Sequence, residues 1–91
     1  MNFAHIDPPL RAWANRNRLP LSTQYKDVEV RSFELAGSSG RAQIWIETDN
    51  GVTVYVWDYR KQKQSFPADT STLEAALDQA LKVARRWCGN P

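Results

Sequence analysis

The chain has 91 residues, 42% of them hydrophobic and 24% charged, and this balance predicts a globular protein with one domain spanning residues 1–91. No apolar run approaches the roughly 20 residues of a transmembrane helix, and the first residues lack the pattern of a signal peptide. Because the single Cys88 cannot form an internal disulfide, we expect a reducing, cytoplasmic location. The net charge of +2 is too small to imply nucleic-acid binding by itself.

A short helix is expected near the N-terminus. Asp7 precedes two prolines, a pattern typical of an N-cap followed by the first helical turn. Pro20 should end the helix, because the residue before a proline avoids helical backbone angles. A helix this short is marginal alone, so we expect it to dock on the rest of the protein. The residues that share its apolar face are Leu10, Trp13 and Ala14.

From residue 28 onward, hydrophobic residues recur with the period of two that is typical of strands. The phase of this alternation changes near Ser32, which predicts a bulged strand. Residues 37–40 form a loop. A second strand is expected over residues 42–47 and a third over residues 52–59.

The turn at Asp49-Asn50-Gly51 decides which side chains share a face of the sheet. A two-residue turn would pair Ile46 with Tyr55, whereas a three-residue turn with a left-handed Gly51 would pair Ile46 with Val54. We favour the three-residue turn because it separates an aliphatic face from an aromatic-polar face. The aliphatic face would contain Ala42, Ile44, Ile46, Val52, Val54 and Val56, and the other face Gln43, Trp45, Glu47, Tyr55, Trp57 and Tyr59.

The remaining residues predict a C-terminal helix over the aliphatic face. Residues 60–64 form either a basic loop or a turn into a short edge strand ending at Phe66. Ser71 and Glu74 have the spacing of a capping box, and Gly89 should end the helix. Its apolar stripe would be Leu73, Ala76, Leu77, Ala80, Leu81, Ala84 and Trp87. The expected class is therefore α+β: an antiparallel meander of three to four strands packed on a long C-terminal helix, with a short N-terminal helix.

Few residues suit catalysis or cofactor binding. The single histidine, His5, lies in a terminal segment, and no second histidine or cysteine joins Cys88 in a zinc site. We expect Cys88 to fill the core. Glu47 and Asp58 could approach as a carboxylate pair, although solvated charges are the expected outcome. The sequence contains no phosphate-binding loop, so we expect neither an enzyme nor a metal or cofactor.

Ten of the 91 residues are aromatic, and several of them fall on one predicted sheet face. Tryptophan and tyrosine dominate protein-binding hot spots, so this face is a candidate binding platform. An alternative is a second small core beneath the N-terminal helix, with Trp13 packed against Trp57. Basic residues that follow the third strand would engage an acidic partner. The candidate partner-binding residues are Trp45, Tyr55, Trp57, Tyr59, Arg60, Lys61 and Lys63.

Two family resemblances bear on function. The order of helix, three strands and helix resembles the double-stranded-RNA-binding domain, but residues 69–74 are acidic where that family is rich in lysine. Residues 28–87 more closely resemble the three-tryptophan, or TriTu-like, immunity proteins of bacterial polymorphic and contact-dependent toxin systems. The resemblance lies in the sequences GRAQIW (residues 40–45) and VYVWD (residues 54–58), the turn ending at Gly51 and the helical start TLEAAL (residues 72–77).

This resemblance implies a non-enzymatic inhibitor that binds a cognate toxin domain and occludes its active site or substrate path. A small nucleic-acid-binding module, using the aromatic face and the basic loop, is the second hypothesis. A structural subunit that dimerises through a free strand edge is the third. We expect no membrane or small-molecule partner.

Overall fold

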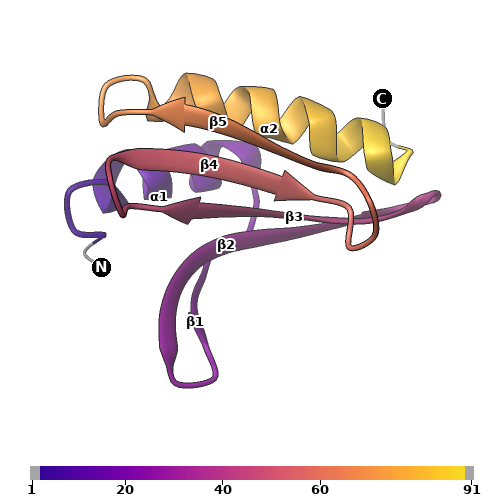
Figure 1. Cartoon of the computed structure of the whole chain (residues 1–91), viewed down its shortest axis with the longest axis horizontal. Coiled ribbons are helices and arrows are strands. Elements are labelled where there is room, and N and C mark those ends of the chain that lie inside the picture. Colours follow the sequence, from indigo (N-terminus) through magenta and orange to yellow (C-terminus); the bar gives the residue numbers. More distant parts are fainter. Residues whose placement is uncertain (1–2, 90–91) are drawn as a thin grey trace.

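A single antiparallel sheet with both helices on one face forms the architecture of the protein (Figure 1). The computed structural model describes residues 3–89. The strand order is β1-β2-β3-β4-β5, a simple meander, and the expected α+β class is confirmed. In chain order the elements are α1 (Asp7–Asn17), β1 (Ser22–Tyr25), β2 (Val28–Gly37), β3 (Gly40–Glu47), β4 (Val52–Trp57), β5 (Lys63–Ala68) and α2 (Leu73–Cys88).

The sheet has five strands rather than the three or four expected. β5 is the edge strand that the sequence left open, and it pairs with β4 along its whole length. β1 was not predicted, because its four residues, Ser22–Tyr25, lack hydrophobic alternation and are mostly exposed. It exists because it pairs with the first half of β2.

The three-residue turn between β3 and β4 is confirmed. Trp45 lies opposite Tyr55 and Ile46 lies opposite Val54. Asn50 and Gly51 both have positive φ, at 61° and 92°, so the turn needs residues that tolerate left-handed backbone.

The hydrophobic core lies between the aliphatic face of the sheet and the two helices. All six predicted aliphatic residues of β3 and β4 are buried, and so is the stripe of α2 apart from the partly buried Trp87. Leu10, Trp13 and Ala14 bury the inner face of α1, as predicted. Each large buried aliphatic side chain contributes about 1.5–3 kcal/mol to folding. None of the helices within residues 3–89 combines the length and apolar character needed to cross a membrane.

The predicted bulge near Ser32 is confirmed and lies in β2. Ser22 pairs with Ser32 while Gln24 pairs with Glu29, so two steps along β1 match three along β2. A bulge of this kind bends the strand and increases its twist. Beyond it, β1 and the start of β2 leave the plane of the sheet as a two-stranded ribbon (Figure 1). We call residues 22–31 the arm.

The predicted start of α1 is wrong by one residue. Ile6 occupies the N-cap position and makes no side-chain cap. Asp7 belongs to the first turn, and its carboxylate instead accepts hydrogen bonds from Arg31. The helix ends at Asn17. The next residue, Arg18, has a left-handed backbone and lies two residues before Pro20.

The predicted capping box of α2 is also wrong. Thr72 is the N-cap, and Asp69 accepts hydrogen bonds from the backbone N–H groups of Ser71 and Thr72. Glu74 forms an ion pair with Arg16 of α1. The predicted C-terminal stop is confirmed, because Gly89 adopts a left-handed φ of 81°.

Candidate functional site

The outer face of the sheet carries four aromatic side chains that neither α1 nor α2 covers. We call this surface the aromatic face; it consists of Trp45, Tyr55, Trp57 and Tyr59, each of intermediate exposure. The alternative of a second core beneath α1 is wrong. Trp13 is fully buried on the opposite face, where it meets Phe33 edge-on at 5.4 Å and donates a 2.8 Å hydrogen bond to Asp78.

The rings of the aromatic face lie in two contacting pairs. Trp45 and Tyr55, which are directly opposite each other on β3 and β4, stack with centroids 5.1 Å apart and planes 13° apart. Trp57 and Tyr59 lie 4.8 Å apart with an angle of 42°. The cross-strand pair Trp45–Tyr55 stabilises the sheet, and the ring contacts within both pairs restrict the orientation of each ring.

Lys63 joins the aromatic face from the edge strand β5. Its Nζ lies 5.4 Å from the Trp45 ring centroid and 5.3 Å from that of Tyr55, within the range of a cation–π interaction. Arg60 and Lys61 lie instead in the exposed loop between β4 and β5. Of the three predicted cations, Lys63 alone is found in contact with these four rings in the described chain.

Tyr59 is held by two residues that the sequence did not indicate. The Arg41 guanidinium lies 4.7 Å above its ring, and its hydroxyl donates a 2.7 Å hydrogen bond to Glu34. Arg41 and Glu34 also form an ion pair at 3.6 Å. Partial burial and the hydrogen bond to the Glu34 carboxylate raise the pKa of Tyr59 to about 12. Extending the β3–β4 register two residues beyond Trp57 would have placed Tyr59 opposite Arg41.

The two carboxylates considered as a pair lie apart. Glu47 is opposite Thr53 and accepts a 2.9 Å hydrogen bond from Trp45 Nε1. Asp58 lies beyond the other end of the β3–β4 ladder, where its carboxylate accepts backbone hydrogen bonds from Arg60 and Gln62 at 2.8 and 3.0 Å. Asp58 therefore orders the basic loop, whereas Glu47 orients an aromatic ring.

A groove of about 900 Å³ connects the aromatic face to the arm. Its lining includes rings from the sheet, several carboxylates and three apolar side chains from the arm: Tyr25, Val28 and Val30. A concave surface with apolar walls and a few polar groups is typical of a binding site. Representative lining residues are Trp45, Trp57 and Tyr59 from the sheet region and Tyr25, Val28 and Glu29 from the arm.

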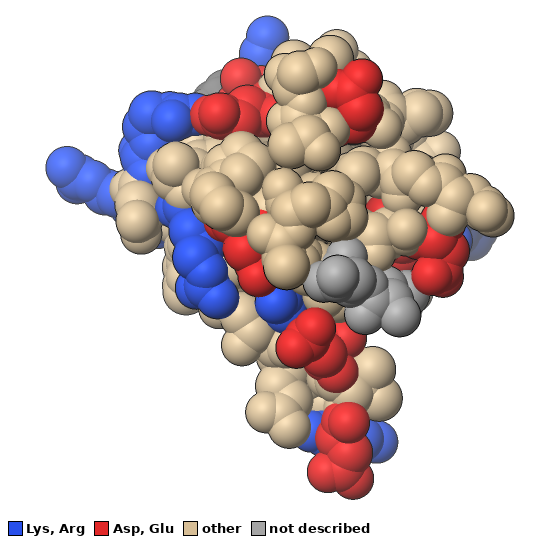
Figure 2. All heavy atoms as spheres, turned by 90° about the vertical axis from the view of Figure 1, so that its left-hand side faces the viewer, with Lys and Arg blue, Asp and Glu red and all other residues tan. Residues whose placement is uncertain are grey.

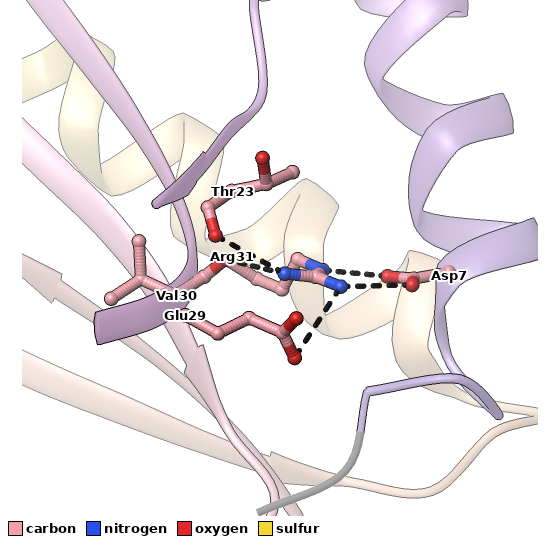
Figure 3. A network of polar contacts seen from close by, with 5 residues as sticks. All are labelled: Asp7, Thr23, Glu29, Val30 and Arg31. Atoms are coloured by element: carbon pink, nitrogen blue, oxygen red, sulfur yellow. Dashed lines mark hydrogen bonds and ion pairs between the residues drawn. The ribbon is translucent and has the colours of Figure 1, made fainter. Parts of the chain in front are cut away.

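Arg31 fixes the base of the arm (Figure 3). Its Nε and Nη2 donate hydrogen bonds of 2.7 and 3.0 Å to the two carboxylate oxygens of Asp7. Its Nη1 donates to the carbonyl of Val30 at 2.7 Å and reaches that of Thr23 at 3.5 Å. The hydrogen bond with Arg31 lowers the pKa of Asp7. One side chain thereby connects both strands of the arm to α1.

The single histidine and the single cysteine of the chain, His5 and Cys88, do not line the groove. His5 is exposed before α1, and Cys88 is fully buried near the end of α2 among core residues. Burial raises the pKa of the Cys88 thiol. Cys88 is therefore a small core residue, as expected from the sequence.

Comparison with protein-family models, with curated proteins and with solved structures finds no match for this chain.

Proposed function

We propose that this protein is a cytoplasmic immunity protein that binds a cognate bacterial toxin domain through the aromatic face. Binding would occlude the active site or the substrate path of the toxin. The observation that carries the proposal is a cluster of four aromatic side chains on a sheet face that neither helix covers. Tryptophan and tyrosine are the residues most enriched at energetic hot spots of protein interfaces.

The rings are also oriented before any partner binds. Stacking holds Trp45 against Tyr55, and the Tyr59 hydroxyl is tied to Glu34. Side chains that are already ordered lose less conformational entropy on association. This arrangement favours a tight and specific complex, as an inhibitor requires.

The charges around the aromatic face favour a protein partner over nucleic acid. Arg41 is paired with Glu34, and Glu47 adds a second carboxylate beside Trp45. A nucleic-acid site needs an excess of free cations to neutralise phosphates. Mixed charge beside aromatic rings is instead common where two proteins meet. The buried free thiol of Cys88 suits the reducing compartment that the proposal assumes.

Affinity capture followed by a toxicity assay tests the proposal. The tagged chain is used as bait in nuclease-treated host lysate, and proteins that resist a high-salt wash are identified. The C-terminal domain of the captured protein is then expressed in a bacterial host, alone and with the chain. We expect the domain alone to arrest growth and co-expression to restore it.

Matched variants connect this result to the aromatic face. Trp57→Ala should weaken binding by roughly 30-fold, as loss of a hot spot of about 2 kcal/mol predicts. Gln79→Ala, an exposed change on α2, should leave binding unchanged. In a parallel capture without nuclease, recovery of nucleic acid that salt releases would favour the nucleic-acid-binding hypothesis instead. Unaltered binding by Trp57→Ala, or no rescue of growth, would contradict the proposal.

A further inference from the structure

The arm extends beyond the sheet as a two-stranded ribbon (Figures 1 and 2). β2 pairs with β3 only from Ser32 onward, whereas its residues 28–31 lie alongside β1 alone. Four strand residues correspond to about 13 Å of projecting ribbon. The arm therefore presents its tip to solvent, away from the hydrophobic core.

The tip of the arm displays apolar side chains. Tyr25 and Val28 face each other across the two strands and are 65% and 60% exposed. Within residues 3–89 they are the exposed large hydrophobic side chains. Paired apolar residues at the end of a projecting ribbon stabilise no core, and such exposed patches mark interaction sites.

The base of the arm, by contrast, is firmly held. Two-stranded hairpins are marginally stable alone in water. Here the Arg31 guanidinium, whose side chain is 7% exposed, bridges the arm to Asp7 of α1 with two hydrogen bonds (Figure 3). A ribbon that is ordered in advance loses less entropy when its tip is bound.

We propose that the arm is the second half of the partner-binding surface and that Tyr25 and Val28 insert into an apolar pocket of the same partner protein. This inference rests on the proposed function. The groove of about 900 Å³ is lined by both the arm and the aromatic face, so one partner that fills it touches both. The toxin domain would be clamped between the tip of the arm and the rings.

The charges of the arm argue for a protein as its ligand. The arm carries Lys26 together with Asp27 and Glu29, and the protruding part of the surface shows both acidic and basic atoms (Figure 2). Phosphates and anionic lipid surfaces attract clusters of free cations, which this ribbon lacks in the described structure. An apolar pair within mixed charge suits an apolar protein pocket with a polar rim.

Photo-crosslinking in intact host cells tests the inference. Benzoylphenylalanine replaces Tyr25 in one version of the full chain, Tyr55 in a second and Gln79 in a third. The Tyr55 position reports on the aromatic face, and Gln79, exposed on α2, is the control. We expect the first two probes to crosslink the same protein and the control to crosslink neither that protein nor a second copy of the chain.

Each outcome separates this inference from the proposed function. A crosslink from position 55 without one from position 25 overturns the role of the arm and leaves the proposed function standing. A crosslink from position 25 to a second copy of the chain also overturns it, in favour of dimerisation through the arm. No protein crosslink from either position contradicts both proposals.

A double variant then measures the contribution of the tip. Tyr25→Thr combined with Val28→Thr keeps residues that favour strands while removing most of the apolar surface. Affinity for the crosslinked partner should fall at least roughly tenfold, and the melting temperature should stay unchanged because both side chains are exposed. Gln64→Ala, on the exposed edge of β5, is the matched control. Unchanged affinity of the double variant would overturn the inference.

Discussion

At the scale of single residues, Tyr59 offers a direct check on the geometry of the aromatic face. Its pKa is raised to about 12 by partial burial and by the hydrogen bond to Glu34. The folded state therefore favours the neutral phenol of Tyr59. The contribution of this group to folding stability is complete below pH 10 and is lost as pH rises through about 12.

Spectroscopic titration of tyrosine measures this effect. Absorbance curves of the wild type and of Tyr59→Phe should coincide through pH 10 and separate only toward about pH 12. Circular dichroism at each point verifies that the chain stays folded. Separation of the two curves already at pH 10 would show that the Tyr59 hydroxyl is not bound to Glu34.

The ion pair between Asp7 and Arg31 makes a second prediction at this scale. The hydrogen bond with Arg31 lowers the pKa of Asp7 from its ordinary 3.8. Its contribution to stability is therefore complete well above pH 3.8 and disappears as pH falls through the lowered folded-state value. Asp7→Asn should cost about 2 kcal/mol near neutral pH, because Arg31 loses a charged hydrogen-bond partner.

Urea unfolding of the wild type and of Asp7→Asn, near neutral pH and at several values below pH 3.8, measures this difference. The gap between the two proteins should shrink as the solution becomes more acidic. Glu29→Gln is the control, because Glu29 is exposed and lies 3.9 Å from Arg31, so its loss should cost less than about 0.5 kcal/mol. A gap that stays constant with pH would exclude Asp7 as the titrating group.

The errors of sequence interpretation at the residue scale have a common physical origin. Asp7 and Glu74 both stand at positions typical of helix caps, but each carboxylate binds a distant arginine instead. A local pattern describes which backbone groups are near in sequence and contains no information about Arg31, 24 residues away. Side-chain partners across the fold therefore could not be predicted. The left-handed Gly89 could be predicted, because the need for glycine at a helix end depends only on the local backbone.

At the scale of elements, hydrophobic period and turn chemistry were sufficient for most of the fold. The register of β3 and β4 followed from the requirement that one face be aliphatic, and it correctly placed Trp45 beside Tyr55. β1 was not predicted because its four residues, three of them polar, show no hydrophobic alternation and are mostly exposed. The arm, half of the proposed binding surface, depends on that strand and so could not be inferred from the pattern.

Trp13 of α1 and Trp57 of β4 lie on opposite sides of the sheet, and substituting each of them tests whether only the helix-covered side is the core. Trp13 attaches α1 to the core, so Trp13→Ala should lower the free energy of unfolding by roughly 3–5 kcal/mol. The milder Trp13→Phe keeps a large ring and loses only the hydrogen bond to Asp78, so it should cost about 1–2 kcal/mol. Trp57→Ala should cost about 1 kcal/mol, since its ring is only partly buried. Chemical denaturation measures all three. Equal costs for Trp13→Ala and Trp57→Ala would mean that the aromatic face is a second core.

At the scale of the whole molecule, the two faces of the sheet contribute differently to the hydrophobic core. The helix-covered face holds the buried cluster, so the fold does not require burial of the four rings on the other face. If the aromatic face binds a partner as proposed, stability and affinity can vary separately. Substitutions on the aromatic face or at the tip of the arm should change affinity with little effect on unfolding, a separation that a second core beneath the rings would not allow.

The distribution of charge over the whole molecule gives the last prediction. The net charge is +2, and the cations Arg41 and Lys63 at the aromatic face are already engaged with a carboxylate or with rings. Association driven mainly by apolar and aromatic contact depends weakly on ionic strength, whereas phosphate binding weakens by about 10³-fold or more between 50 and 200 mM salt for six or more contacts. The affinity for the captured toxin domain, measured by calorimetry over that salt range, should change by less than roughly tenfold. A steep linear fall of log affinity with log salt would instead show that binding is driven by the release of counterions from phosphates. The aromatic face would then be a base-stacking surface beside a basic loop.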